Sequence, residues 1–329
     1  MDTSRRRDAA GWDAILYAAS FVAAIVVLRT SNGPLDVRWA MFGAFGYGAG
    51  ALAAWALSRR GASLPARATL GMCVFVVVAV VPTVLNADAR TGPGTAPVKS
   101  DVLVVEQAAA SLLEGGNPYA VGHDEGPLAT WPSWARYHYP YLGGLLAAGA
   151  PRALAGPAPW TDPLLLSLGL AAAVTAPSIL LSGASPESRL RTLLVLFVLA
   201  TGAPLVVTSG KEILVLAMLL ASLVALRRRH PTLSGIAAGS AAAMHQLAWV
   251  VLPIYAFMPA KTGGRCVAAI AATVALAAVV PFLVWGPSAF LEDAVLFPLG
   301  FGQPAGGIAF TPGGLLASVF PGSRWLMVV

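Results

Sequence analysis

The chain has 329 residues, of which 57% are hydrophobic and only 11% are charged, and its mean hydropathy is +0.74. Soluble domains carry about 25% charged residues, so the composition excludes that class and predicts an all-α polytopic membrane protein, a transmembrane helical bundle. The formal net charge of +6 does not indicate nucleic-acid binding, because excess lysine and arginine in a membrane protein mark the cytoplasmic loops.

A hydrocarbon core about 30 Å thick requires about 20 apolar residues per crossing helix. Apolar stretches predict membrane spans at residues 12–28, 38–57, 68–85, 162–182, 192–208, 212–226 and 266–285. Arg5-Arg6-Arg7 precedes the first span and predicts an uncleaved signal-anchor helix. Cys73 and Cys266 lie far apart and indicate neither a disulfide framework nor a metal site.

The basic residues predict the orientation of these spans. Arg5–Arg7 place the N-terminus in the cytoplasm, as Arg59, Arg60 and Arg67 place the loop two spans later. The segment 86–138 is therefore expected on the extracytoplasmic side. The arginine clusters further on stay cytoplasmic only if 139–155 does not cross the membrane and 233–258 enters and returns. His245 and Gln246 would then form the tip of a two-part hairpin.

The segment 86–138 interrupts the apolar spans and places a group of ionisable residues next to the bilayer. Within it, residues 101–114 predict an amphipathic helix that lies flat on the membrane, with Val102, Val105, Ala109, Leu112 and Leu113 on one face. Asp101 stands in the first turn. It could simply cap the helix, or it could be a reactive carboxylate held at the bilayer edge. The chain is expected to form a single integral domain over 1–329, and the apolar 325–329 suggests a protein that continues further.

The order of motifs resembles the GT-C superfamily of membrane glycosyltransferases, and within it glycosyltransferase family 87. The resemblance covers roughly residues 80–320. It rests on Asp101 early in the outer loop, the amphipathic helix, Leu113-Glu-Gly-Gly-Asn-Pro-Tyr119 and the aromatic Tyr137-His-Tyr-Pro140 before a short helix. This chain has Tyr141 at the second proline of the family's Tyr-Pro-Pro motif. It also has Gly210-Lys211 for a Gly-Gln pair, and His245-Gln246 where a lysine is usual.

The resemblance implies an inverting transfer of a sugar, mannose in that family, from a polyprenyl-phosphate-linked donor to a glycan or glycolipid acceptor. The reaction would take place on the outer side of a bacterial-type plasma membrane. Asp101 matches the catalytic base. The outer loops contain no Asp-x-Asp pair, so we expect no metal and no cofactor. The leaving phosphate and the sugar would be bound by candidates on the outer side, namely Arg136, His138, Tyr139, Lys211, His245 and Gln246.

Other interpretations of these residues stay open. His245 could be a hydrogen-bonded histidine between helices, and Lys211-Glu212 could be an interfacial charge pair. The second function class is a transporter or flippase of a lipid-linked or small polar substrate, with the broken hairpin lining its path. A transferase should depend on Asp101, whereas a transporter should depend on intramembrane polar groups such as His245.

Overall fold

The computed structural model describes residues 3–92, 97–120, 122–259 and 262–299, and over these ranges it contains helices and no strand. The predicted all-α class is confirmed. The chain divides into two compact units, residues 1–99 with 157–220 (unit 1) and residues 100–156 with 221–329 (unit 2). The expected single domain stays a prediction. The apolar residues 325–329 lie outside the described part.

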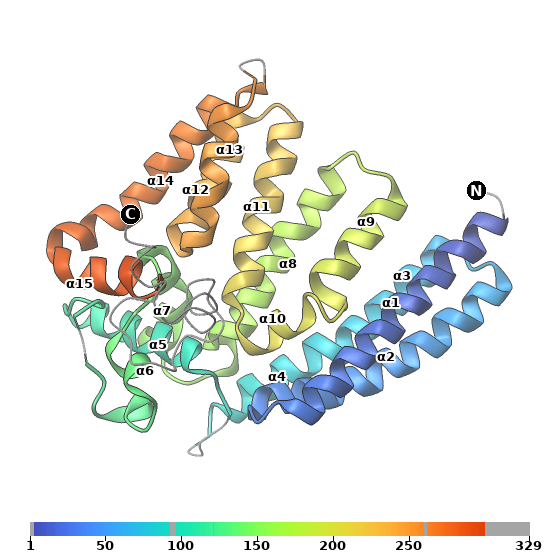
Figure 1. Ribbon diagram of the computed structural model, residues 1–329, viewed down its shortest axis with the longest axis horizontal. Coiled ribbons are helices and arrows are strands. Elements are labelled where there is room, and N and C mark those ends of the chain that lie inside the picture. The colour runs from blue at the N-terminus through green and yellow to red at the C-terminus, as the bar shows by residue number, and fades with distance from the viewer. Residues whose placement is uncertain (1–2, 93–96, 121, 260–261, 300–329) are drawn as a thin grey trace, which may run out of the picture. The chain divides into compact units, whose positions relative to one another are not determined.

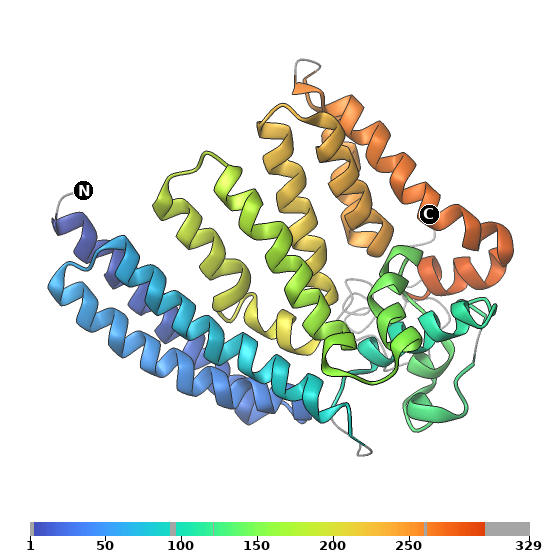
Figure 2. The ribbon, with the colours of Figure 1, turned by 180° about the vertical axis from the view of Figure 1, so that it is seen from behind.

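Unit 1 is built around three long helical segments that lie side by side: α1, α2 and the continuous run α3–η1–α4 (Figures 1 and 2). α1 and α2 are antiparallel, because only residues 31–33 separate them. The bounds in unit 1 are α1 Thr3–Thr30, α2 Pro34–Arg60, α3 Leu64–Phe75, η1 Val76–Val80, α4 Val81–Ala89, η4 Pro159–Thr161, α8 Pro163–Leu181, α9 Pro186–Leu193, η5 Leu194–Val198 and α10 Ala203–Thr208, followed by α11 Lys211–Arg227, which continues into unit 2.

Helices long and apolar enough to cross a membrane occur five times in the described part of the chain, at Arg7–Thr30, Pro34–Arg60, Leu64–Ala89, Pro163–Leu181 and Gly264–Trp285. Large apolar side chains on them face outward; Phe45 and Leu52 are each 71% exposed. An apolar outer surface of this kind suits lipid rather than water. The chain is therefore an integral membrane protein.

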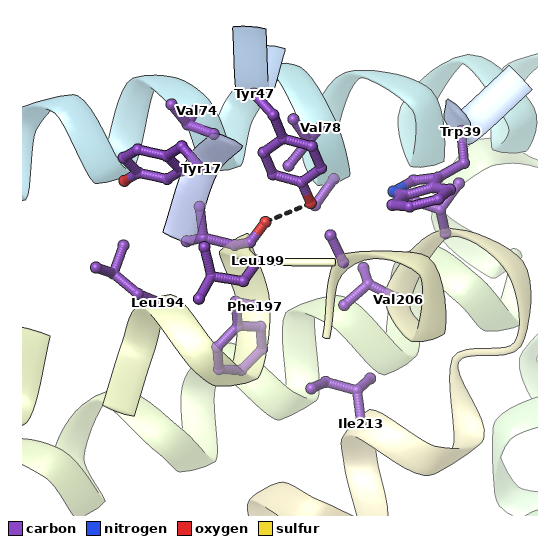
Figure 3. Packing of buried hydrophobic residues seen from close by; sticks show 14 of the residues in the cluster. Tyr17, Trp39, Tyr47, Val74, Val78, Leu194, Phe197, Leu199, Val206 and Ile213 are labelled. Atoms are coloured by element: carbon purple, nitrogen blue, oxygen red, sulfur yellow. Dashed lines mark hydrogen bonds between the residues drawn. The ribbon is translucent and has the colours of Figure 1, made fainter. Parts of the chain in front are cut away.

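The predicted span at 192–208 is wrong as a continuous helix. η5 ends at Val198, Leu199 is extended, and α10 begins only at Ala203. A side chain at Gly202 would lie 1.9 Å from the carbonyl oxygen of Leu196, so the chain turns sharply there. Side chains from other helices satisfy the freed backbone groups: the Tyr47 hydroxyl donates to the Val198 carbonyl at 2.6 Å (Figure 3), and Ala200 N donates to Ser20 Oγ at 3.2 Å.

Arg67, used above as a sign of a cytoplasmic loop, is buried in unit 1. Its guanidinium lies between the carboxylates of Asp13 on α1 and Glu187 on α9, and its side chain is only 3% exposed. Buried charges of opposite sign at hydrogen-bonding distance offset part of each other's desolvation cost. Arg67 therefore joins three helices, and Arg59 and Arg60 remain as the exposed basic residues of this loop.

Unit 2 combines short helices of the predicted outer segment with a group of longer helices. Its bounds are α5 Ser100–Leu113, η2 Gly126–Leu128, α6 Ser133–Tyr137, η3 Gly143–Leu145, α7 Leu146–Ala155, the second part of α11, α12 Pro231–Met244, η6 Gln246–Val250, α13 Val251–Phe257, α14 Gly264–Trp285, α15 Pro287–Leu291 and η8 Glu292–Leu296. α12 packs closely on α14 through Gly235 and Gly239, a small-xxx-small pair that lets the two backbones approach.

The predicted hairpin at 233–258 is present as a broken helix. α12 ends at Met244, and η6 folds back against its last turn, since the Trp249 indole donates to the Ala242 carbonyl at 2.7 Å; α13 then packs on α14. At the far end of the hairpin, the hydroxyls of Ser222 and Tyr255 lie 2.7 Å apart. α7 has 10 residues and, at about 1.5 Å per residue, is too short to cross a bilayer. This length agrees with the expectation for 139–155.

Candidate functional site

Asp293 holds the aromatic segment 137–142 of unit 2. This acid lies on η8, a π-helical turn, and is only 3% exposed. Its Oδ1 lies 2.6 Å from Nδ1 of His138, and its Oδ2 accepts the backbone N–H of Tyr139 at 2.8 Å. Both carboxylate oxygens are therefore used on two consecutive residues, which fixes the backbone and the imidazole together.

The surroundings of Asp293 act on its ionisation in both directions. Burial raises the pKa of the Asp293 carboxyl, the bonds from His138 and from Tyr139 N oppose this rise, and the nearby charge of Glu292 adds to it. A carboxylate at Nδ1 selects the imidazole tautomer that carries its proton on that nitrogen. The second nitrogen, Nε2, is then the one that can meet a substrate, and the His138 side chain is 17% exposed.

Gln246 links the same segment to the hairpin tip. Its Nε2 donates to the carbonyls of Pro140 at 3.0 Å and Ala294 at 2.8 Å, so both amide hydrogens are used. Beside it, His245 Nδ1 accepts the N–H of Leu247 at 3.2 Å and thereby caps η6. The imidazole of His245 also lies near the ring of Tyr141, with 6.2 Å between the centroids. The described hydrogen bond of His245 is local rather than between helices, and its role in substrate binding stays a prediction.

Tyr119 packs its buried ring against the aromatic segment 137–142. The ring contacts those of Tyr139, Phe282 and Phe290 at centroid distances of 5.2, 5.4 and 4.9 Å. Burial, together with the charge of Asp293, raises the pKa of Tyr119 above its ordinary value. The hydroxyl therefore stays protonated and donates to the Tyr141 carbonyl at 2.9 Å.

Two glycines allow the chain to leave this segment. A side chain at Gly143 would lie 2.2 Å from the ring of Phe282, and one at Gly144 would lie 2.7 Å from the carbonyl oxygen of Ala243. The backbone therefore passes directly against α14 and the end of α12. Tyr139, which is 2% exposed, donates its hydroxyl to the Leu142 carbonyl at 3.3 Å, so its described contacts belong to the packing of this turn.

Asp101 is the second residue of α5 and is partly exposed. It lies inside the first helical turn rather than in front of it, so the position is not that of an N-cap. A carboxylate there interacts favourably with the helix dipole. α5 packs against α7, where a side chain at Gly149 would lie 2.5 Å from the Val105 carbonyl oxygen.

The prediction of an amphipathic α5 is only partly met. Besides the expected Val102 and Val105, the residues Leu103, Val104 and Glu106 are also buried, so the first two turns are covered on nearly every side. Glu106 lies 3.5 Å from Nε of Arg152 on α7. The sequence pattern missed this, because it could not anticipate that α7 and other segments cover the polar face.

Arg136 and Lys211 have described contacts of other kinds. Arg136 lies over the ring of Tyr137 and 3.3 Å from the carboxylate of the exposed Asp124. Lys211 belongs to unit 1, is 8% exposed, and contacts Ser209 Oγ at 2.9 Å and Glu212 at 3.1 Å. The structure thus brings together His138, Tyr139 and Gln246, with His245 next to the last of them.

The sequence analysis missed Asp293, which is one of two adjacent acids, Glu292-Asp293, and therefore forms no Asp-x-Asp pair. A usable signal was present: one acid of the pair had to enter an apolar stretch, and ionisable residues in such stretches need a partner. The partner, His138, lies 155 positions away in the chain.

Over the residues that the structure describes, the protein is a helical membrane protein in which short helices, too short to cross a bilayer, accompany the spanning ones. The family model of glycosyltransferase family 87 matches residues 137–300, which include the aromatic segment, the hairpin tip and Asp293. The chain belongs to glycosyltransferase family 87 and is a glycosyltransferase. No significant match was found among curated proteins or solved structures.

Proposed function

We propose that the enzyme transfers a sugar, mannose, from a polyprenyl-phosphate donor to a glycan or glycolipid acceptor on the extracytoplasmic side of the membrane. The observation that carries the proposal is the family match over residues 137–300. A lipid-linked donor agrees with a site built from short helices in an integral membrane protein. The match also favours the transferase over the transporter, which the sequence alone had left open.

In the proposed mechanism, the Asp101 carboxylate accepts the proton of the acceptor hydroxyl as its oxygen attacks the anomeric carbon. The bond from that carbon to the phosphate oxygen breaks, and polyprenyl phosphate leaves with the bonding electrons. A single displacement inverts the anomeric configuration. The partial exposure of Asp101 suits a group that must meet a substrate, and general-base catalysis contributes about 10²–10⁴-fold.

The departing phosphate gains negative charge and needs hydrogen-bond donors or cations. Among the candidates, His138 offers Nε2 because Asp293 occupies Nδ1. Gln246 has both amide hydrogens bonded to carbonyls, so only its oxygen remains for a sugar hydroxyl. Arg136, Lys211, Tyr139 and His245 remain proposed substrate contacts.

The test is sugar transfer from labelled polyprenyl-phosphate mannose by purified enzyme in liposomes. Asp101→Asn should reduce transfer about 10²-fold or more, because the amide cannot accept the proton. The matched control is Asp88→Asn, the same change at an exposed acid, which should leave transfer unchanged. Both variants should insert into the membrane and unfold at the temperature of the wild type.

Transfer retained in Asp101→Asn would refute the role of this residue as the base. Transfer from a nucleotide sugar, with none from the lipid-linked donor, would refute the donor class while leaving family membership intact. A lipid-linked donor carrying another sugar, used in preference to mannose, would correct the sugar alone.

A further inference from the structure

A groove of about 530 Å³ lies at one end of unit 1, where the start of α1 meets the end of α2. Arg7, Asp8 and Gly11 line it from α1, and Ser58 and Arg59 line it from α2. The first span of the chain begins at Arg7. The groove therefore lies at the edge of the membrane, in a part of the molecule that the proposed transfer reaction does not use.

The polar end of the groove favours an anion. Arg7 and Arg59 contribute two positive charges against one negative charge from Asp8, and Arg60 follows directly in the chain. The Arg59 guanidinium lies 4.9 Å above the ring of Trp55, a cation–π contact that orients it. Because guanidinium groups bind phosphate through paired hydrogen bonds, this end matches a phosphate better than a neutral head group.

The other end of the groove is apolar. Trp12 and Ile15 continue the same lining on α1 and are 60% and 56% exposed. From Arg7 to Ile15 the helix rises about 12 Å, which carries the groove from the interface into the hydrocarbon region. Between the two ends, Gly11 leaves a notch, since a side chain there would meet no atom within 4 Å.

We propose that this groove is a binding site for an anionic phospholipid, with its phosphate on Arg7 and Arg59 and an acyl chain along Trp12 and Ile15. Charge complementarity selects the phosphate, and the apolar wall selects a lipid over a free anion. The proposal does not depend on the sugar, the donor or the base of the transfer reaction. Anionic lipid is enriched on cytoplasmic membrane surfaces, the side predicted for this end of the chain.

The experiment measures lipid binding to the purified full chain in a neutral detergent, by native mass spectrometry and by titration with fluorescent phosphatidylglycerol. Phosphatidylglycerol should bind at least tenfold more tightly than phosphatidylcholine. Arg59→Gln should weaken binding about fivefold. A basic residue near an anionic membrane surface contributes ~1 kcal/mol to binding, and a tenfold change in affinity corresponds to about 1.4 kcal/mol. Arg7→Gln with Arg59→Gln should weaken it about 25-fold.

Two further variants separate a built site from general attraction. Gly11→Leu keeps every charge but fills the notch, and it should weaken phosphatidylglycerol binding with no loss of stability. Arg227→Gln removes an equal charge from an exposed arginine that does not line the groove, and it should leave binding unchanged.

Each opposite result overturns the proposal. Equal weakening in Arg227→Gln and Arg59→Gln would mean nonspecific attraction to cationic protein. Unchanged binding in Gly11→Leu would mean that the lipid lies elsewhere, and equal binding of phosphatidylcholine would remove the role of the arginines. Competition by inorganic phosphate as strong as that by the lipid would make the groove a site for a free anion.

Discussion

Asp293 contributes to the fold and to the site through the same two contacts. Its carboxylate oxygens hold Tyr139 N and His138 Nδ1, and the next residue, Ala294, accepts the Gln246 amide. A π-helical turn carries one residue more than an α-helical turn and often occurs at functional sites. Here the π-helical turn directs one carboxylate and one carbonyl, from adjacent residues, at the aromatic segment and at the hairpin tip.

Replacement of Asp293 should therefore destabilise the protein. Asp293→Ala leaves the Tyr139 N–H without its carboxylate partner in a buried place, which costs about 1–3 kcal/mol. The measurement is thermal unfolding in detergent. Glu292→Ala is the matched control, because this neighbouring acid is exposed and its loss should change stability by less than about 0.5 kcal/mol. Equal effects of the two changes would show that the contacts of Asp293 do not stabilise the fold.

The same residue predicts a pH dependence. The folded pKa of Asp293 is raised above its ordinary value of 3.8 by burial, so the folded state binds this proton more tightly than the unfolded state. Its contribution to stability is full below about pH 4 and is lost as the pH rises through the folded pKa. Asp293→Asn removes this titration. As the pH rises from 4 to 8, the unfolding temperature of the wild type should therefore fall relative to that of Asp293→Asn. A difference between the two unfolding temperatures that stays constant over this range would contradict the raised pKa.

At the scale of elements, the break between η5 and α10 illustrates how a membrane protein tolerates an interrupted helix. Irregular backbone within the membrane is possible only where protein groups satisfy its carbonyls and amides. The Val198 carbonyl is satisfied by Tyr47, which is fully buried and reaches it from α2, 151 positions away in the chain. The core of unit 1 closes around this bond (Figure 3).

Tyr47→Phe tests this account, since it removes one oxygen and little else. The buried carbonyl of Val198 would lose its donor, at an expected cost of about 1–3 kcal/mol, read as a lower unfolding temperature. In Tyr137→Phe, the same change is made at a tyrosine that is 41% exposed, and stability should stay within about 0.5 kcal/mol. A loss no greater at Tyr47 than at Tyr137 would argue against the bond as the support of the break.

The contact between α12 and α14 depends on the absence of a side chain. A Cβ at Gly239 would lie 2.6 Å from Cβ of Val274 and 2.8 Å from the carbonyl oxygen of Ala271. Gly239→Val should push the helices apart and cost about 1–3 kcal/mol or more. Leu233→Val places the same β-branched residue at an exposed site of α12 and serves as control. Unchanged unfolding of Gly239→Val would show that the helices can separate without loss.

At the scale of the whole molecule, the sequence predicted what depends on composition and local pattern. The helix expected at 101–114 is α5 at Ser100–Leu113, and the interruption expected near His245 separates α12 from η6. The sequence could not predict features that depend on contacts between residues far apart in the chain. The continuous span at 192–208 failed because Tyr47 stabilises a break there, and Asp293 was overlooked because its contacts lie on the segment 138–139.

The predicted orientation of the molecule is open to a direct measurement. Glu125 is exposed in the segment expected outside, and Ser63 is exposed in the turn between α2 and α3, expected in the cytoplasm. In a background with Cys73 and Cys266 replaced by alanine, Glu125→Cys should react with a membrane-impermeant maleimide on intact cells. Ser63→Cys should react only after permeabilisation, because the basic residues around it remain inside. The reverse pattern would move Asp101 to the cytoplasmic side, where the proposed reaction could not meet an extracytoplasmic acceptor.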